Sequence, residues 1–165
     1  MLGAAAWTGL LPAHRAAAET ARFIPWSDAR TPPLALQDLA GRPHALADYR
    51  GKVVLVNFWT TWCEPCRDEM PSMQKLRERL AGRPFAILAV NFGESEPRVR
   101  AFVKQAGVDF TVLLDPNQEA PRPWRVRVLP ASFLVGADGH VRYSVIGEVD
   151  WTGDEALDTL RGLLR

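Results

Sequence analysis

Two cysteines, Cys63 and Cys66, are the only cysteines in this chain, and two residues separate them. Thiols at this spacing can close a disulfide across one helical turn and can exchange that bond with a disulfide in another molecule. The segment 53–59 before them is a continuous apolar, β-rich run, and the segment after them has apolar residues at helical spacing. We therefore predict that Cys63 begins a helix at the end of a buried strand and that Cys66 lies inside that helix.

This expected position makes the two sulfur atoms unequal. Cys63 would lie where free backbone N–H groups and the positive end of the helix dipole favour a thiolate, so its pKa should fall below the ordinary value of about 8.5. Cys63 is therefore the candidate nucleophile, and Cys66 is the candidate thiol that resolves the mixed disulfide. Pro65 fixes the backbone between them at an early helical position, where its missing N–H costs little.

Other uses of a cysteine pair fit the sequence less well. A zinc site would need two more ligands, but there is no further cysteine and the three histidines are scattered singly. Covalent haem attachment would need a histidine at the position of Arg67. We expect no metal and no cofactor, because the redox group would be the disulfide between Cys63 and Cys66. A purely structural disulfide remains an alternative, although so short a loop would stabilise the fold little.

The elements that must position the cysteines follow from the pattern of apolar residues. Alternating segments on either side of Gly41 predict a small β-hairpin within residues 34–46. Pro71 should kink the helix that carries Cys66, and the stretch 121–123 allows only a short irregular turn. Strands are expected at 53–59, 85–91, 110–114, 131–135 and 141–146, and helices at 64–80, at 95–106 with Ser95 as a possible cap, and at 152–164.

The first residues differ from the rest in composition. Residues 2–11 are mostly apolar or small and a run of small residues follows, which resembles the apolar region and cleavage site of a secretory signal without its basic start. We expect a signal or membrane-anchor remnant and tail at 1–22, with an Ala-rich disordered tail as the alternative, and one domain at 23–165. An apolar run of about ten residues is too short to cross a bilayer, which needs about 20.

The composition limits the classes of molecule that we expect this chain to bind. The chain has 165 residues, 47% of them hydrophobic, with 20 Lys and Arg against 19 Asp and Glu. A domain of this size can bury an ordinary hydrophobic core. Because its surface charge is balanced, nucleic acid is not an expected partner.

The segment 51–71, which reads GKVVLVNFWTTWCEPCRDEMP, resembles the TlpA/ResA/CcmG branch of the thioredoxin superfamily. The resemblance extends to 128–135, to Asp138-Gly139 and to 147–151, so it covers the chain from about residue 34 to residue 165. It implies an α/β, thioredoxin-like fold, in which helices flank a central mixed β-sheet. The predicted hairpin would form an N-terminal extension of that fold.

The resemblance also implies a client-binding surface around the cysteines. Pro130 would follow a cis peptide bond, and the backbone of Leu129 and Pro130 would pair with an incoming client strand. Trp62, Glu64 and Pro65 would border the same site. From the sequence alone, Pro130 indicates only a turn or a strand edge.

A proton-handling residue is implied as well. Glu69, three residues after Cys66, would set the thiol pKa values and move a proton during exchange. The alternative is a solvated carboxylate, since Asp68 and Glu69 begin a charged stretch of helix. Asn57 stands where ordinary thioredoxins have a buried Asp, which shifts proton handling toward Glu69.

The function implied by the resemblance is a thiol:disulfide oxidoreductase that reduces client proteins in the periplasm or elsewhere outside the cytoplasm, either soluble or tethered to a membrane. Apocytochrome c is one client class, and a membrane thiol carrier of the DsbD or CcdA kind would supply electrons. One alternative is a peroxiredoxin-type peroxidase, since Thr60 and Cys63 match its Thr-x-x-Cys motif, although Val56 stands where that motif needs Pro. Another is a non-catalytic binding module with the same fold.

Overall fold

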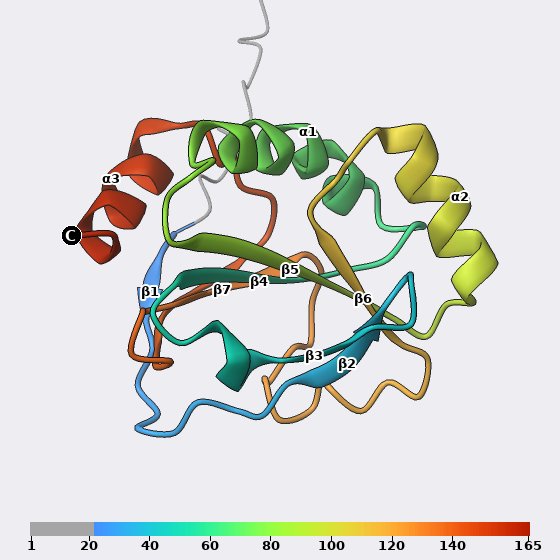
Figure 1. Ribbon diagram of the computed structural model, residues 1–165, viewed down its shortest axis with the longest axis horizontal. Helices are drawn as coiled ribbons and strands as arrows, with labels where there is room; N and C mark the ends of the chain where they lie inside the picture. Colours follow the sequence, from blue (N-terminus) through green and yellow to red (C-terminus); the bar gives the residue numbers. More distant parts are fainter. Residues whose placement is uncertain (1–21) are drawn as a thin grey trace, which may run out of the picture.

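The computed structural model describes residues 22–165, so all of the expected signal or anchor segment except Arg22 lies outside the described residues. The protein has a mixed sheet and three α-helices (Figure 1). The strands are β1 (Ile24–Pro25), β2 (Ala35–Asp38), β3 (Pro43–Ala45), β4 (Val53–Trp59), β5 (Phe85–Phe92), β6 (Thr111–Asp115), β7 (Ala131–Val135) and β8 (Val141–Ile146). The helices are α1 (Glu64–Arg79), α2 (Glu96–Ala106) and α3 (Asp154–Leu163), with a 3₁₀ turn, η1 (Leu46–Tyr49).

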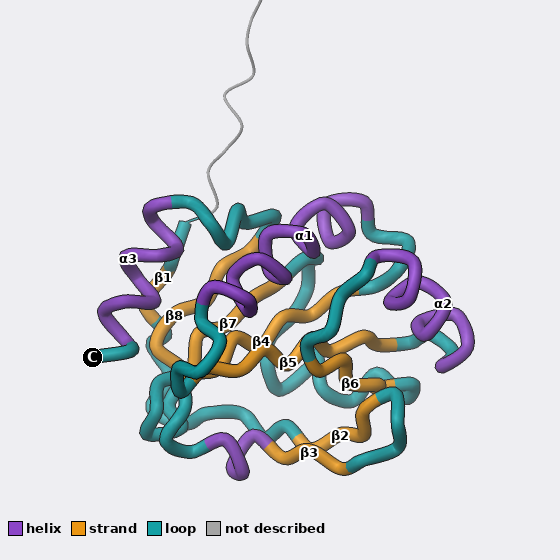
Figure 2. The backbone as a smooth tube through the Cα atoms, turned by 45° about the horizontal axis from the view of Figure 1, so that its top comes forward, coloured by secondary structure: helices purple, strands orange, loops and turns teal. Residues whose placement is uncertain are grey.

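The strands form one continuous layer in the order β1-β8-β7-β4-β5-β6-β2-β3 (Figure 2). β4 lies between β5, which is parallel to it, and β7, which is antiparallel. Every residue of β4 is buried, as its continuous apolar run predicts. Because β4 and β5 are parallel, their carboxyl ends emerge at the same edge of the sheet, and the cysteine motif begins there.

The two faces of the sheet are covered differently. Successive side chains of a strand point to opposite faces, so Leu55 and Trp59 pack in one apolar cluster that includes residues of α1, α2 and α3. Val56 and Phe58 pack in the other, together with Trp124, which lies in the turn after β6. The Trp124 indole N–H donates to the carbonyl of Pro33 at 3.1 Å. Within residues 22–165, loops and η1 therefore cover the face opposite the α-helices.

The expected elements are present, with shifted ends. Residues 121–123 form turns, α3 begins at Asp154 instead of residue 152, and α1 continues through the solvent-facing Pro71 to Arg79. Ser95 occupies the cap position of α2, but its side chain makes no capping hydrogen bond. None of the helices in residues 22–165 is long and apolar enough to cross a membrane.

Within residues 34–46, β2 and β3 pair antiparallel, and β2 also pairs with β6. This pair of strands therefore continues the sheet sideways beyond β6. Asp38 at the end of β2 closes the turn between them, since its carboxylate accepts the backbone N–H groups of Ala40 and Arg42.

Candidate active site

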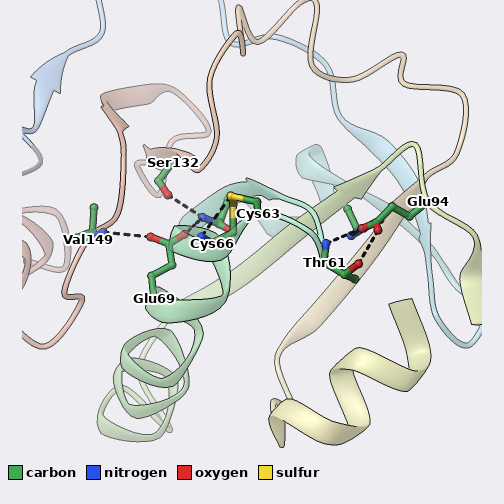
Figure 3. Close-up of a disulfide and its surroundings, with 9 residues drawn as sticks. Thr61, Cys63, Cys66, Glu69, Glu94, Ser132 and Val149 are labelled. Atoms are coloured by element: carbon green, nitrogen blue, oxygen red, sulfur yellow. Dashed lines mark hydrogen bonds between the residues drawn. A yellow bond between two sulfur atoms is a disulfide. The ribbon is translucent and has the colours of Figure 1, made fainter. Parts of the chain in front are cut away.

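The site begins with a disulfide between Cys63 and Cys66 at the start of α1 (Figure 3). Cys63 is the N-cap residue and has an extended backbone, with φ −82° and ψ 106°. Its sulfur accepts a hydrogen bond from the backbone N–H of Cys66 at 3.3 Å. The structure therefore confirms the predicted placement, with Cys63 at the helix start and Cys66 inside the first turn.

The two sulfurs differ in access to solvent. Cys63 keeps 6% of its surface exposed, whereas Cys66 is completely buried. The residues around them, Trp62, Glu64 and Pro65, are all exposed. A molecule that approaches the disulfide from solvent thus meets Cys63 first.

Glu69 lies on the inward face of α1 and is only 1% exposed. The alternative of a solvated helix carboxylate is therefore wrong, because position 69 follows Cys66 by nearly one turn and shares its buried side. Burial raises the pKa of Glu69 to about 8, and the hydrogen bonds that the carboxylate accepts from Asn57 and from the Val149 backbone limit this rise. These bonds are 2.6 and 3.2 Å long.

Asn57 connects the helix to two strands. Its side-chain Nδ2 donates to Glu69 and, at 3.0 Å, to the hydroxyl of Ser132, which lies directly opposite Asn57 in the pairing of β4 with β7. The Asn57 Oδ1 atom is buried and has no hydrogen-bond partner. Figure 3 shows this network beside the disulfide, with Glu69 between Val149 and the start of α1.

The peptide bond between Leu129 and Pro130 is cis, as the resemblance implied. Phe58 pairs with Ala131, so the register places Pro130 beside Trp59, the last residue of β4. The Pro130 carbonyl accepts the backbone N–H of Gly147 at 2.9 Å. The cis peptide bond therefore lies at the edge of the sheet from which the cysteine loop departs.

Trp59 and Trp62, on either side of the two threonines before the cysteine pair, differ in burial. Trp59 is fully buried and packs against Phe102 of α2, whereas Trp62 is 65% exposed. The structure therefore brings Trp62, Glu64 and Pro65 to the surface beside Cys63.

Sequence reasoning missed Glu94, which follows β5. Its carboxylate accepts the backbone N–H of Thr61 at 2.7 Å, the Thr61 hydroxyl at 2.6 Å and the Asn91 amide at 2.8 Å. Burial favours the neutral acid, but these hydrogen bonds and the nearby Arg98 outweigh it and hold the pKa of Glu94 below its ordinary value. The parallel order of β4 and β5 was the available signal, since residues that follow neighbouring parallel strands meet at one edge.

In the part of the chain that the structure describes, no group of three or more His, Cys, Asp or Glu side chains could hold a metal ion. The redox-capable group within residues 22–165 is the disulfide between Cys63 and Cys66.

Comparisons with known proteins agree with this geometry. Residues 28–144 match the AhpC/TSA family model. Thiol-disulfide oxidoreductase ResA of Geobacillus thermodenitrificans is 40% identical over 116 residues, which cover 70% of this chain and 67% of that protein.

Solved structures show the same architecture. A candidate thiol:disulfide interchange protein DsbE of Chlorobium tepidum is 30% identical with a TM-score of 0.76, and the match covers 81% of this chain and 94% of that one. A second thiol:disulfide interchange protein of Chlorobium tepidum, of the thioredoxin family, is 27% identical with a TM-score of 0.68, covering 84% and 100%. The expected thioredoxin-like fold is thus confirmed.

Proposed function

Because this chain belongs to the AhpC/TSA family and is a ResA-like thiol-disulfide oxidoreductase, we propose that it reduces disulfide bonds in client proteins outside the cytoplasm. The observation that carries the proposal is the disulfide between Cys63 and Cys66 at the N-terminus of α1. We assign the attack to Cys63, which is the sulfur with access to solvent.

The first step starts from the reduced protein. Free N–H groups at the start of α1 stabilise the Cys63 thiolate. The thiolate attacks one sulfur of the client disulfide and forms a mixed disulfide with it. The client S–S bond breaks, and its electron pair leaves on the second client sulfur, which takes up a proton.

The second step resolves the mixed disulfide. Cys66 loses its proton and attacks the Cys63 sulfur, so that the bond between Cys63 and the client breaks and the client sulfur held in that bond leaves and takes up a proton. The client gains two electrons and two protons, and the protein returns to the disulfide form. A dithiol donor must then reduce it, and a membrane thiol carrier of the DsbD or CcdA kind fits this requirement.

Glu69 is the group that we assign to the proton of Cys66. It is buried three residues further along the same helix. With burial raising its pKa to about 8, this carboxyl can both accept and release a proton near neutral pH. The residues beside Cys63 in the sequence are exposed to solvent, so we assign the proton of the Cys63 thiol to water.

The client-binding surface is proposed to be apolar. Trp62, Val128 and Ile146 are large apolar residues that stay exposed. Trp62 precedes Cys63, Val128 lies two residues before Pro130, and Ile146 pairs with Ala131 at the same edge of the sheet. Exposed apolar groups gathered around a reactive group indicate a docking surface. Glu64, Pro65 and the backbone of Leu129 would complete it.

Apocytochrome c before haem attachment is the client class that we propose, because its Cys-x-x-Cys-His attachment motif carries two cysteines that can form a disulfide. We place the protein in the periplasm or an equivalent compartment, soluble or tethered.

The test is the equilibrium reduction potential of the cysteine pair against defined glutathione ratios, read from tryptophan fluorescence. A value near or below about −230 mV supports a reductant, and a value near about −120 mV would reverse the direction of electron flow. The same protein with Cys63→Ser should lose all disulfide reductase activity toward a client peptide. Unchanged function in that variant would instead support a binding module.

A thiol peroxidase is the second candidate, because Thr60 lies three residues before Cys63. The Thr60 hydroxyl is buried and has no hydrogen-bond partner within the described residues, so it does not bind the Cys63 sulfur. The reduced protein should therefore consume hydrogen peroxide far more slowly than a client disulfide.

A further inference from the structure

Glu94 is a buried carboxylate outside the cysteine motif. Its side chain is 6% exposed, and it belongs to the connection between β5 and α2. Both of its oxygens accept hydrogen bonds from Thr61, one from the hydroxyl and one from the backbone N–H. Thr61 lies two residues before Cys63, so Glu94 binds the loop that delivers the attacking sulfur.

Arg98 completes this group of contacts. Its Nε lies 2.9 Å from the Glu94 carboxylate and donates to the Thr61 hydroxyl at 2.8 Å. The Arg98 side chain is 60% exposed and lies four residues after Glu94 in the sequence. A buried anion near the start of α1 is thus paired with one cation, and both contact Thr61, as Figure 3 shows for the Glu94 bonds.

We propose that Glu94 is a positioning residue that holds the Thr60–Trp62 loop and so places the Cys63 sulfur, and that Arg98 balances the charge that this sulfur experiences. The inference rests on the proposed function, in which Cys63 is the nucleophile. It adds that the reactivity of the Cys63 thiol is influenced by residues outside the cysteine motif, in the connection between β5 and α2 and at the start of α2.

The charges of Glu94 and Arg98 should shift the pKa of the Cys63 thiol in opposite directions. Glu94 is held by Thr61, two residues before Cys63, so its negative charge disfavours a second one at the Cys63 sulfur, and Arg98 offsets that effect. Loss of the Glu94 charge should therefore lower the pKa of the Cys63 thiol, and loss of the Arg98 charge should raise it. Damage to packing alone would move both variants in the same direction or leave the pKa unchanged.

Other charged groups surround this end of α1. Glu64, Arg67 and Glu69 lie on α1 itself, and Glu148 lies in the loop after β8 and interacts with Glu69. These groups are unchanged in the variants at positions 94 and 98, so a difference in the pKa of Cys63 between those variants reports the charge of Glu94 or of Arg98.

The experiment uses the chain with Cys66→Ser, in which Cys63 is the single thiol. The rate of alkylation by iodoacetamide is measured against pH, because the thiolate is the reacting form. At a pH below the thiol pKa, Glu94→Gln should react about threefold to tenfold faster, and Arg98→Met slower by a similar factor.

The matched controls are Glu96→Gln and Arg100→Met. Glu96 and Arg100 form an ion pair with the same four-residue spacing on α2, and neither contacts Thr61. They should leave the alkylation profile of Cys63 in place. If Glu94→Gln does not fold, Arg98→Met decides alone, since a raised pKa supports the proposal and an unchanged one overturns it.

Positioning has its own readout. Glu94→Ala removes every acceptor for Thr61 and should abolish the protection of the Thr61 amide against hydrogen exchange. Retained protection would show that the loop does not depend on Glu94. Shifts of the same sign in Glu94→Gln and Arg98→Met would overturn the charge balance.

Failure of the proposed function is distinguishable from failure of this inference. Alkylation reports the Cys63 thiol whether or not the protein turns over a client. A chain that shows the opposed shifts but reduces no disulfide would refute only the function.

Discussion

Asn57 of the central strand donates a hydrogen bond to Glu69 of α1 across 2.6 Å, and both residues are buried. No salt bridge within the described residues includes Glu69. The carboxyl therefore has neutral partners, and burial raises its pKa to about 8. A carboxyl whose pKa lies near neutral pH can exchange protons with the neighbouring thiol pair.

The first prediction concerns the stability of the oxidised protein against pH, in which the cysteines do not titrate. The pKa of Glu69 is about 8 in the folded protein and 4.5 ordinarily. The folded state thus binds more protons between these values, and the free energy of unfolding should fall as pH rises from 4.5 to 8, by at most about 1.4 kcal/mol per pH unit. Glu69→Gln should remove this slope, measured by urea unfolding.

Glu119→Gln is the control for that measurement. Glu119 is exposed, and its side chain makes no hydrogen bond or ion pair in the described structure. It should keep the slope of the unaltered protein. A Glu69→Gln protein with the same pH profile as the parent would disprove the assigned pKa.

The second prediction concerns Asn57→Asp. Two carboxyl groups at this distance cannot both ionise easily, so they should share one proton and titrate as a coupled pair. The pKa of the pair for losing its last proton should rise above that of Glu69 in the parent protein. Carboxyl carbon NMR against pH measures it, with Ser132→Ala as the control that keeps a single carboxyl.

The third prediction separates the roles of the two cysteines. Because Cys66 is fully buried and Cys63 is not, Cys66→Ser should trap a mixed disulfide between Cys63 and a disulfide peptide. Cys63→Ser should form none. Intact-mass measurement after brief mixing decides, and a stable adduct on Cys66 would reverse the assignment.

The fourth prediction concerns the tryptophans. Trp62 is 65% exposed, so Trp62→Ala should change the free energy of unfolding by less than about 0.5 kcal/mol while raising the KM for a disulfide peptide. Trp124 is fully buried against Phe58 and Phe133. Trp124→Ala should cost about 3 to 5 kcal/mol of stability. An unchanged KM in Trp62→Ala would remove that residue from the client surface.

Local patterns in the sequence predicted most of the elements. The run 53–59, apolar except for Asn57, specified a strand buried on both faces, and apolar spacing specified α1 with Cys63 and Cys66 at its start. Both follow from interactions between neighbours along the chain. Helix ends were less accurate, as at Asp154, because the Asp150 carboxylate accepts the Thr152 N–H and hydroxyl and holds Thr152 in a turn before the helix.

Contacts between distant segments were decided by the tertiary structure. The charged stretch that includes Asp68 and Glu69 indicated a solvated surface, yet packing against β4 buries Glu69 beside Asn57. Nothing local distinguishes Glu94 from other surface acids, and it meets Thr61 only because β4 and β5 are parallel and end at one edge.

The sequence by itself determined the chemistry: a cysteine pair, its helix, and the strand before it. The tertiary structure decided the surroundings of that pair, including the proton site at Glu69, the loop contacts of Glu94 and the cover that Trp124 gives the second face. The physical reason is that burial, and the pKa changes that burial causes, depend on which distant segments pack together.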